Sequence, residues 1–446
     1  MSNAKSEKEN RDFNRRTFIG AAAIVGAGAV LASCQKSYPP MKFVDKAPDG
    51  PPLKAGLIGC GSRGTGAVLN FLKAGPNLKI VALGDVLKDH LDTSRENLAK
   101  KAQVQVPDDH CFIGFDAYKK VLEADVDLVL LTTPPHFRPQ HFDAAVDAKK
   151  HCFIEKPVAV DAPGVRSILA TGQKAAAYNL CVVAGTMRRH NRTYQETQNR
   201  VSHGAIGKII AAYGRLNRSQ LWYTPKKKEW SDMEAMIRDW LNWSWLSGDD
   251  IVESHVHNID CELWFTGMNP TKVIGTGGRV QRVTGNQFDF FNSQFSYPNG
   301  GIFESMTRNI DGCANEFTDC VIGTEGYTNC ENTIYDLSGK VVWKYQEEGQ
   351  DPGKSKVNPY DQEHVDFVNA IRTNQPLNET EHVAHATLTA IMGRTAAYTG
   401  KEVTWEEMMD SGERLGPTEY AMGPVPIKAE VPVPGNAKDV AKHART

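Results

Sequence analysis

The stretch LKAGLIGCGSRGTGAVLNFLKAGPNLKIVALGD, residues 53–85, decides the fold of the first half of this 446-residue chain. An apolar run leads into a glycine-rich turn and a helix-like segment, and a second apolar run ends in an acid. The turn, GCGSRG at 59–64, is a complete G-x-G-x-x-G directly after a strand. Such glycines let the backbone approach a pyrophosphate at the N-terminus of the next helix. The stretch therefore predicts a dinucleotide-binding domain.

Asp85 follows Gly64 by 21 residues, at the tip of the second predicted strand. An acid at this place accepts hydrogen bonds from ribose hydroxyls and repels a 2′-phosphate, which favours NAD over NADP. Arg63 in the turn leaves NADP open, because a guanidinium can pair with a pyrophosphate or with a 2′-phosphate. A glycine-rich loop that holds no ligand is the alternative interpretation.

Further strands and helices follow the turn. An apolar strand at 127–131, a helix at 138–150 and a strand at 152–154 that ends in EKP (155–157) continue the alternation. Continuous apolar strands between helices predict a parallel, doubly wound sheet, whose ligands bind beyond the carboxyl ends of the strands. The residues expected at the cofactor are Gly59, Gly61, Ser62, Arg63, Gly64, Asp85, Thr132, Pro134, His136, Glu155 and Lys156.

Strand-like runs dominate the second half. They lie at 207–216, 271–284, 287–296, 301–309, 316–323 and near 340, and two amphipathic helices follow within 360–399. Long strands joined by turns predict an α+β domain with a large, mostly antiparallel open sheet. An open sheet face commonly serves for oligomerisation, so we expect a homodimer or homotetramer.

The densest cluster of polar residues is GDDIVESHVHNID, residues 248–260. Apolar spacing predicts a helix over 251–266 that Gly267 ends. On such a helix Glu253, His257 and Asp260 share one face, whereas His255 points elsewhere. Two histidines that diverge, with no third ligand at a suitable spacing, make a metal site the weaker interpretation. An ordinary amphipathic core helix with a capping histidine is the other alternative.

With GLIGCGSRG, Asp85, LLTTPPHFRPQH and EKP in view, the chain resembles the glucose-fructose oxidoreductase, inositol dehydrogenase and rhizopine-catabolism (Gfo/Idh/MocA) superfamily over residues 53 to about 400. The resemblance implies NAD(P)-dependent oxidation or reduction of sugars and cyclic polyols. It also implies that the lysine of EKP, Lys156, reaches the reacting centre.

The family pattern G-G-x-L-x-D-x-G-x-H-x-x-D overlays the dense stretch. It implies that His257 is the general base and that Glu253 orients it, in the place of a family aspartate whose side chain is one methylene shorter. His255 stands where the family has a glycine, and a substrate contact is expected for it. The residues expected on the substrate side are Arg188, Arg189, His190, Trp222, Tyr223, His255 and Asp260.

The N-terminus has the layout of an export signal. Arg15 and Arg16 precede an apolar Ala/Gly-rich run that ends in LASC, which resembles a twin-arginine signal with a lipidation cysteine at Cys34. We expect a periplasmic protein held to the membrane through this lipid anchor. The predicted parts are a signal (1–34), a Pro-rich tether (35–52), an NAD-binding Rossmann domain (53–175), an α+β substrate and oligomerisation domain (176–412) and an irregular tail (413–446).

Composition and location narrow the function. A formal net charge of −2 without a long basic block argues against nucleic acid and favours a small carbohydrate or polyol substrate. Free NAD is not expected outside the cytoplasm, so the cofactor should be tightly bound and recycled in place. Three functions stay open: a sugar or polyol dehydrogenase, an NAD-dependent glycosidase that acts by transient oxidation and elimination, and a non-catalytic binding lipoprotein.

Overall fold

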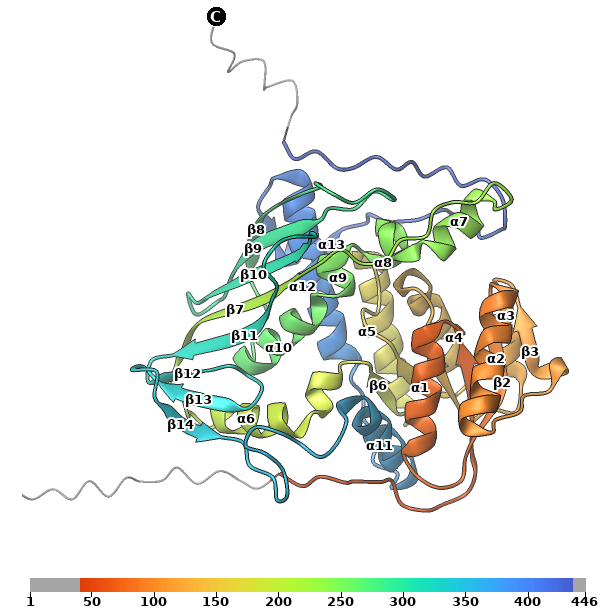
Figure 1. The fold of residues 1–446 in the computed structure, drawn as a ribbon, viewed down its shortest axis with the longest axis horizontal. Coiled ribbons are helices and arrows are strands. Elements are labelled where there is room, and N and C mark those ends of the chain that lie inside the picture. The colour runs from red at the N-terminus through yellow and green to blue at the C-terminus, as the bar shows by residue number, and fades with distance from the viewer. Residues whose placement is uncertain (1–40, 436–446) are drawn as a thin grey trace, which may run out of the picture. The chain divides into compact units, whose positions relative to one another are not determined.

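The computed structural model describes residues 41–435, and these form two β-sheets with their covering helices (Figure 1). The predicted export and lipidation signal at 1–34 lies outside the described residues. Between residues 41 and 435, no helix is long and apolar enough to cross a membrane.

The first sheet has six parallel strands in the order β3-β2-β1-β4-β5-β6. Its strands are β1 (Leu53–Ile58), β2 (Leu78–Asp85), β3 (Cys111–Ile113), β4 (Leu128–Leu131), β5 (His151–Ile154) and β6 (Val182–Ala184). Its helices are α1 (Ser62–Lys73), α2 (Lys88–Ala102), α3 (Ala117–Glu123), α4 (Arg138–Asp147) and α5 (Ala162–Ala177), with 3-10 turns η1 (Asp108–His110), η2 (Pro135–Phe137) and η3 (Met187–His190). The next helix, α6 (Arg192–Ser202), packs on η3 and on α10 (Val256–Thr266) of the second half. All four residues of β4 are buried, as a strand covered on both faces requires. The strand order reverses between β1 and β4, so the predicted doubly wound Rossmann fold is confirmed.

The second sheet has nine strands in the order β14-β13-β12-β11-β7-β10-β9-β8-β15. They are β7 (Ile209–Arg218), β8 (Lys272–Gly278), β9 (Phe290–Ser296), β10 (Ile302–Asn309), β11 (Glu316–Gly323), β12 (Gly326–Thr328), β13 (Thr333–Asp336), β14 (Val341–Lys344) and β15 (Val403–Thr404). β7 and β10 pair in parallel, and the other pairs with a recorded register are antiparallel. Burial alternates along β9 and β10, so one face of the sheet is covered. The predicted large, mostly antiparallel sheet is confirmed.

Helices from the second half connect the two sheets. They are α7 (Asp232–Arg238), η4 (Trp240–Asn242), α8 (Ser244–Ser247), α9 (Asp250–Glu253), α10 (Val256–Thr266), α11 (Pro359–Arg372), α12 (Thr380–Thr399) and α13 (Trp405–Asp410). α12 packs on α5 of the first sheet and on β8 and β9 of the second, and α11 packs on α1. One continuous apolar core therefore runs from one sheet to the other.

The part of the predicted tether that the structure describes, residues 41–52, lies against the Rossmann fold. Ala47 is buried, and its N–H donates to the Ala74 carbonyl at 2.8 Å. Asp45 pairs with Arg192 near the start of α6. These contacts fix the direction from which the chain enters β1.

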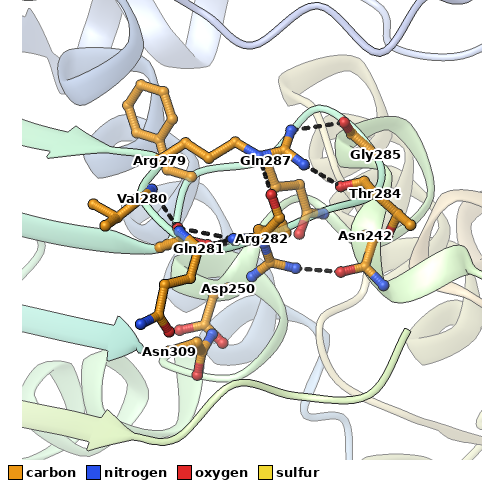
Figure 2. Close-up of polar contacts among 12 residues, drawn as sticks. Asn242, Asp250, Arg279, Val280, Gln281, Arg282, Thr284, Gly285, Gln287 and Asn309 are labelled. Atoms are coloured by element: carbon orange, nitrogen blue, oxygen red, sulfur yellow. Dashed lines mark hydrogen bonds and ion pairs between the residues drawn. The ribbon is translucent and has the colours of Figure 1, made fainter. Parts of the chain in front are cut away.

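The connection between β8 and β9 differs from the sequence prediction, because residues 279–289 form a folded loop, whereas strand was expected at 279–284 and 287–289. Figure 2 shows the Arg279 guanidinium turned onto carbonyl groups of this loop, those of Thr284 at 2.6 Å and Gly285 at 2.8 Å. The fully buried carboxylate of Asp289 accepts the backbone N–H groups of residues 280–282. Arg282 then reaches Asn242 on η4 at 2.5 Å. Charged side chains thus form hydrogen bonds with backbone N–H and C=O groups of the loop, which neighbouring strands would have paired in a sheet.

Asp289→Ala should lower the free energy of unfolding by about 3–5 kcal/mol, because it leaves three loop N–H groups without an acceptor and removes the carboxylate that faces the buried Arg282 guanidinium. A urea titration followed by tryptophan fluorescence measures the change. Asp125→Ala removes a carboxylate whose side chain is 83 % exposed, and it should change stability by less than about 1 kcal/mol. Equal effects of the two substitutions would contradict this account of the loop.

Candidate active site

The backbone of the glycine-rich turn packs too closely for side chains at two of its three glycines. Gly59 has φ of +99°, and a Cβ there would lie 2.6 Å from the Thr133 nitrogen. A Cβ on Gly64 would lie 2.0 Å from the Gly59 oxygen, whereas a Cβ on Gly61 would meet nothing within 4 Å. Gly59 and Gly64 therefore pack the turn against the residues that follow β4, and Gly61 leaves open space in front of α1. No side chain caps α1, so its first amides are available to an anion.

A cavity of about 900 Å³ opens from this turn. Its wall includes Asp85, Thr132 and Pro134, and it extends past α2 to Phe115 and Trp240. The turn and the size of the cavity fit a dinucleotide.

Asp85 at the end of β2 holds the turn in place. Its carboxylate accepts the N–H of Cys60 at 2.6 Å and that of Leu87 at 2.8 Å. Burial raises the pKa of Asp85, although these N–H donors oppose the shift. A carboxylate has capacity for more than two donors, so its place in the cavity wall still suits a ribose hydroxyl.

Two of the predicted cofactor residues turn toward each other. Arg63 contacts Glu155, and its Nη2 lies 3.1 Å from an oxygen of buried Glu363. Nearby carboxylates raise the pKa of Arg63, although its burial alone would lower it. The guanidinium is therefore already paired with protein carboxylates. Arg63 still lines the cavity, but Glu155 is not part of its wall.

His136 lies behind the cavity wall. Its Nε2 is 2.7 Å from the Tyr420 hydroxyl, and its ring packs edge-on against Trp245. Burial, with help from Arg414, lowers the pKa of His136 to about 3. A neutral, buried ring suits a packing role better than direct cofactor contact.

A second cavity, of about 360 Å³, contains Lys156, Glu253 and His257 in its wall. Trp222 and Trp240 line both cavities. A ligand of the second cavity therefore lies next to the dinucleotide cavity.

His257 is not on the same helix as Glu253. α9 ends at Glu253 and α10 begins at Val256, and the His255 N–H reaches back five residues to the Asp250 carbonyl. The predicted continuous helix over 251–266 is thus wrong at its start. The break follows from contacts of its two residues: Ser254 Oγ accepts from Arg218 at 2.6 Å, and His255 enters the core.

The ring of His257 faces the second cavity without a partner. Among residues 41–435, no hydrogen bond to this ring is found, while its backbone carbonyl accepts from Arg188. Burial lowers the pKa of His257 well below its usual value, and the nearby cations Lys156, Arg188 and Arg218 lower it further. The ring is therefore neutral at neutral pH and able to accept a proton.

The carboxylate of Glu253 pairs with Lys156 and not with His257. Its Oε1 lies 3.1 Å from Lys156 Nζ, and its Oε2 accepts from Ser254 Oγ at 2.6 Å. Lys156 also donates to the backbone carbonyl of Glu253. Burial would raise the pKa of Glu253, but Lys156 and Ser254 outweigh it and lower that pKa. The role of orienting His257, which the resemblance implied for Glu253, has no contact to support it.

The remaining predicted substrate residues divide into two groups. Arg188 lines the second cavity and Trp222 lines both, whereas Tyr223 is exposed outside them. Arg189 and Asp260 form a bidentate ion pair at 2.8–2.9 Å, away from both cavities.

Two histidines are held below the surface. His255 is fully buried with Nε2 2.8 Å from Ser305 Oγ, and burial lowers its pKa to about 3. Burial alone would also lower the pKa of His190, but the carboxylates of Glu379 and Asp366 raise it well above its usual value. Neither placement supports the substrate contact expected for these residues.

Residues that the sequence did not single out complete the second cavity. They are Arg218, which ends β7, and Tyr360, in the first turn of α11. Tyr360 is more than 100 residues away from His257, so no local pattern linked them. Between residues 41 and 435, no group of three His, Cys, Asp or Glu side chains could hold a metal.

Comparison with known proteins points to one family. Residues 53–186 match the family described as "Oxidoreductase family, NAD-binding Rossmann fold". The chain is 29% identical over 237 residues to a "Glycosyl hydrolase family 109 protein" of Solibacter usitatus, covering 51% of each. It is 27% identical over 163 residues to an "Inositol 2-dehydrogenase" of Salmonella typhimurium, covering 36% of this chain and 45% of that protein. The chain thus spans about half the length of the curated relatives it matches.

A solved structure extends the likeness across both sheets. The scyllo-inositol dehydrogenase of Lactobacillus casei with bound NAD(H) and scyllo-inositol has a TM-score of 0.58 at 21% identity, covering 79% of this chain and 99% of that one. At this identity the likeness shows the fold alone. The family match over residues 53–186 and this shared fold support the expected resemblance to the Gfo/Idh/MocA superfamily.

Proposed function

We propose that the protein is an NAD-dependent oxidoreductase that moves hydride between the nicotinamide and a hydroxyl-bearing carbon of a sugar, glycoside or cyclic polyol. One observation carries the proposal. An unpartnered, neutral His257 and a lysine face a small cavity that shares the walls Trp222 and Trp240 with the dinucleotide cavity. A proton acceptor, a cation and a hydride acceptor are what oxidation of an alcohol requires.

The residues of the second cavity divide the chemistry between them. The nicotinamide, when bound, supplies the hydride acceptor. His257 takes the hydroxyl proton on its neutral ring. Lys156, held by Glu253 at 3.1 Å, donates toward the substrate oxygen and stabilises negative charge that develops there. Trp222, Trp240 and Tyr360 offer flat apolar faces of the kind that stack on sugar rings.

Equilibrium binding and turnover test the proposal together. We expect the purified full chain to bind NADH with enhanced fluorescence, and to reduce NAD when sugars and cyclic polyols are added. An NADH-binding protein that turns over none of them would be a binding module. Absence of NADH binding would overturn the proposal.

His257→Ala should lower kcat for alcohol oxidation by about 10²–10⁴-fold, because the proton acceptor is lost. NADH affinity should stay within about twofold, because His257 lies outside the dinucleotide cavity. His203→Ala, at an exposed position, is the control and should keep wild-type kcat.

The pH profile tests the same base. Since the pKa of His257 is lowered, the ring stays deprotonated as pH falls through 6.5, and kcat/KM for oxidation should be flat from pH 8 to 6. The acid limb should therefore lie below pH 6. A limb centred at or above pH 6.5 would contradict the assignment of His257 as a neutral base in this environment.

The preference for NAD over NADP is proposed on the place of Asp85. Its carboxylate lines the dinucleotide cavity and would repel a 2′-phosphate. Asp85→Ser should weaken NADH binding by about tenfold or more and narrow the difference between NADH and NADPH, measured by fluorescence titration. Asp92→Ser, an exposed acid on α2, is the control and should leave both affinities unchanged. A wild-type protein that prefers NADPH would overturn this preference.

A glycosidase that works through transient oxidation is the second candidate. The match to the family 109 glycosyl hydrolase, over 51% of this chain, favours it. The same His257, Lys156 and dinucleotide cavity would serve both reactions, because both begin with oxidation at a ring carbon. Release of a chromogenic aglycone with catalytic NAD would identify the glycosidase, whereas stoichiometric NADH would identify the dehydrogenase.

Export and assembly are also proposals. The Arg15-Arg16 motif and Cys34 support a lipid-anchored periplasmic protein that carries a tightly held NAD. Exposed Ile210, Ile274 and Phe317 on three strands of the second sheet support a homo-oligomer through that sheet.

A further inference from the structure

The irregular segment after α13 does not leave the molecule but turns back over the dinucleotide cavity. In Figure 1 the blue segment passes α8, turns beside α7 and runs back along the edge. We call residues 415–425 the strap. No hydrogen-bonded helix or strand stabilises it, so side chains and single backbone bonds fix its path.

Two parts of the chain, the start of α5 and α7, anchor the strap. The Leu415 N–H donates to Asp161 at the start of α5 at 2.9 Å. The Gly423 carbonyl accepts from the N–H of Met233 on α7 at 3.0 Å, and the Val425 side chain is buried beside it. The strap therefore connects the Rossmann half of the cleft to α7, which belongs to the other half.

Gly416 brings the strap into close contact with η2 and α8. It has φ of +94°, and a Cβ there would lie 2.7 Å from His136 and 2.9 Å from Trp245. Such an approach is available to glycine alone, since both the backbone conformation and the space exclude a side chain. The strap is thus fitted to this surface.

Tyr420 is the strap residue that reaches the cavity. Its hydroxyl lies 2.7 Å from His136 Nε2, and its ring stacks on Phe115 with centroids 5.9 Å apart. Tyr420 lines the dinucleotide cavity together with Phe115 and Phe137, while Arg238 and Trp240 line it from the other half. Tyr420 therefore places the strap against the Rossmann wall of the cavity, whereas the Gly423 carbonyl ties the strap to α7 on the other side.

We propose that the strap retains the dinucleotide, and that Tyr420 must leave Phe115 and His136 before the cofactor can enter or depart. This inference rests on the proposed NAD-dependent function. A barrier that has to open for passage slows entry and release alike, whereas a simple binding contact slows release alone. The strap would keep one dinucleotide bound over many turnovers, as a cofactor that is recycled in place requires.

Stopped-flow fluorescence with the full chain tests the strap. The protein is loaded with NADH and mixed with excess NAD to measure release, and entry is measured by mixing the empty protein with NADH. Tyr420→Ala should accelerate both rate constants by at least tenfold. Tyr420→Phe keeps the ring contacts and loses the His136 hydrogen bond, so a smaller acceleration of both is expected; it also serves if the alanine variant does not fold.

Met422→Ala is the matched control, because this side chain is 47% exposed on the same strap, and both of its rates should equal those of the wild type. The strap is overturned if Tyr420→Ala and Tyr420→Phe leave both rates unchanged, if they accelerate release alone, or if Met422→Ala has the same effect. In each of those cases the wild type still binds NADH. A wild type that binds no NADH overturns the proposed function, and the strap with it.

Discussion

The ion pair between Lys156 and Glu253 connects the two halves of the candidate site. Lys156 follows β5 of the first sheet, Glu253 ends α9 beneath the second, and both side chains are largely buried, at 13% and 17% exposed. A buried pair of this kind adds little net stability, but removing one partner leaves an uncompensated charge in the interior. The main effect of the pair is therefore to fix the position of the Lys156 side chain. The pair fixes the lysine in the wall of the second cavity, where its ammonium group also donates to the backbone carbonyl of Glu253.

Local physics made much of the fold predictable. The glycine turn, the acid at β2 and the apolar strands between helices depend on neighbours in the sequence, and these features appear as predicted. The prediction of a continuous helix over 251–266 was wrong because contacts with distant strands determine where the helix breaks. Arg218 on β7 donates a hydrogen bond to the Ser254 hydroxyl, and Ser305 on β10 is hydrogen-bonded to the His255 ring. Helical spacing carries no information about partners 36 and 50 residues away.

The same limit applies to the walls of the site. Glu253 was expected beside His257 because four residues separate them, yet its carboxylate turned to Lys156, 97 residues earlier. The strap shows the limit most clearly, since a Pro-rich segment without periodicity gives no sign of where it packs. The roles of Gly416 and Tyr420 become visible in the folded chain, where they pack against His136, Phe115 and Trp245.

The charges around the second cavity explain how a base of lowered pKa still suits its task. Each cation in the wall has a carboxylate partner: Lys156 has Glu253, Arg188 has Asp319 at 2.6 Å, and Arg218 has Asp250 at 3.1 Å. Asp250 and Asp319 do not line the cavity, so two of the three cations face it with their partners set behind. The resulting positive potential weakens His257 as a base, because it opposes the imidazolium. It also favours negative charge on a substrate oxygen in the same cavity, which lowers the pKa of the hydroxyl that loses the proton. Both pKa values are lowered, so the potential that keeps the resting histidine neutral also makes the hydroxyl easier to deprotonate.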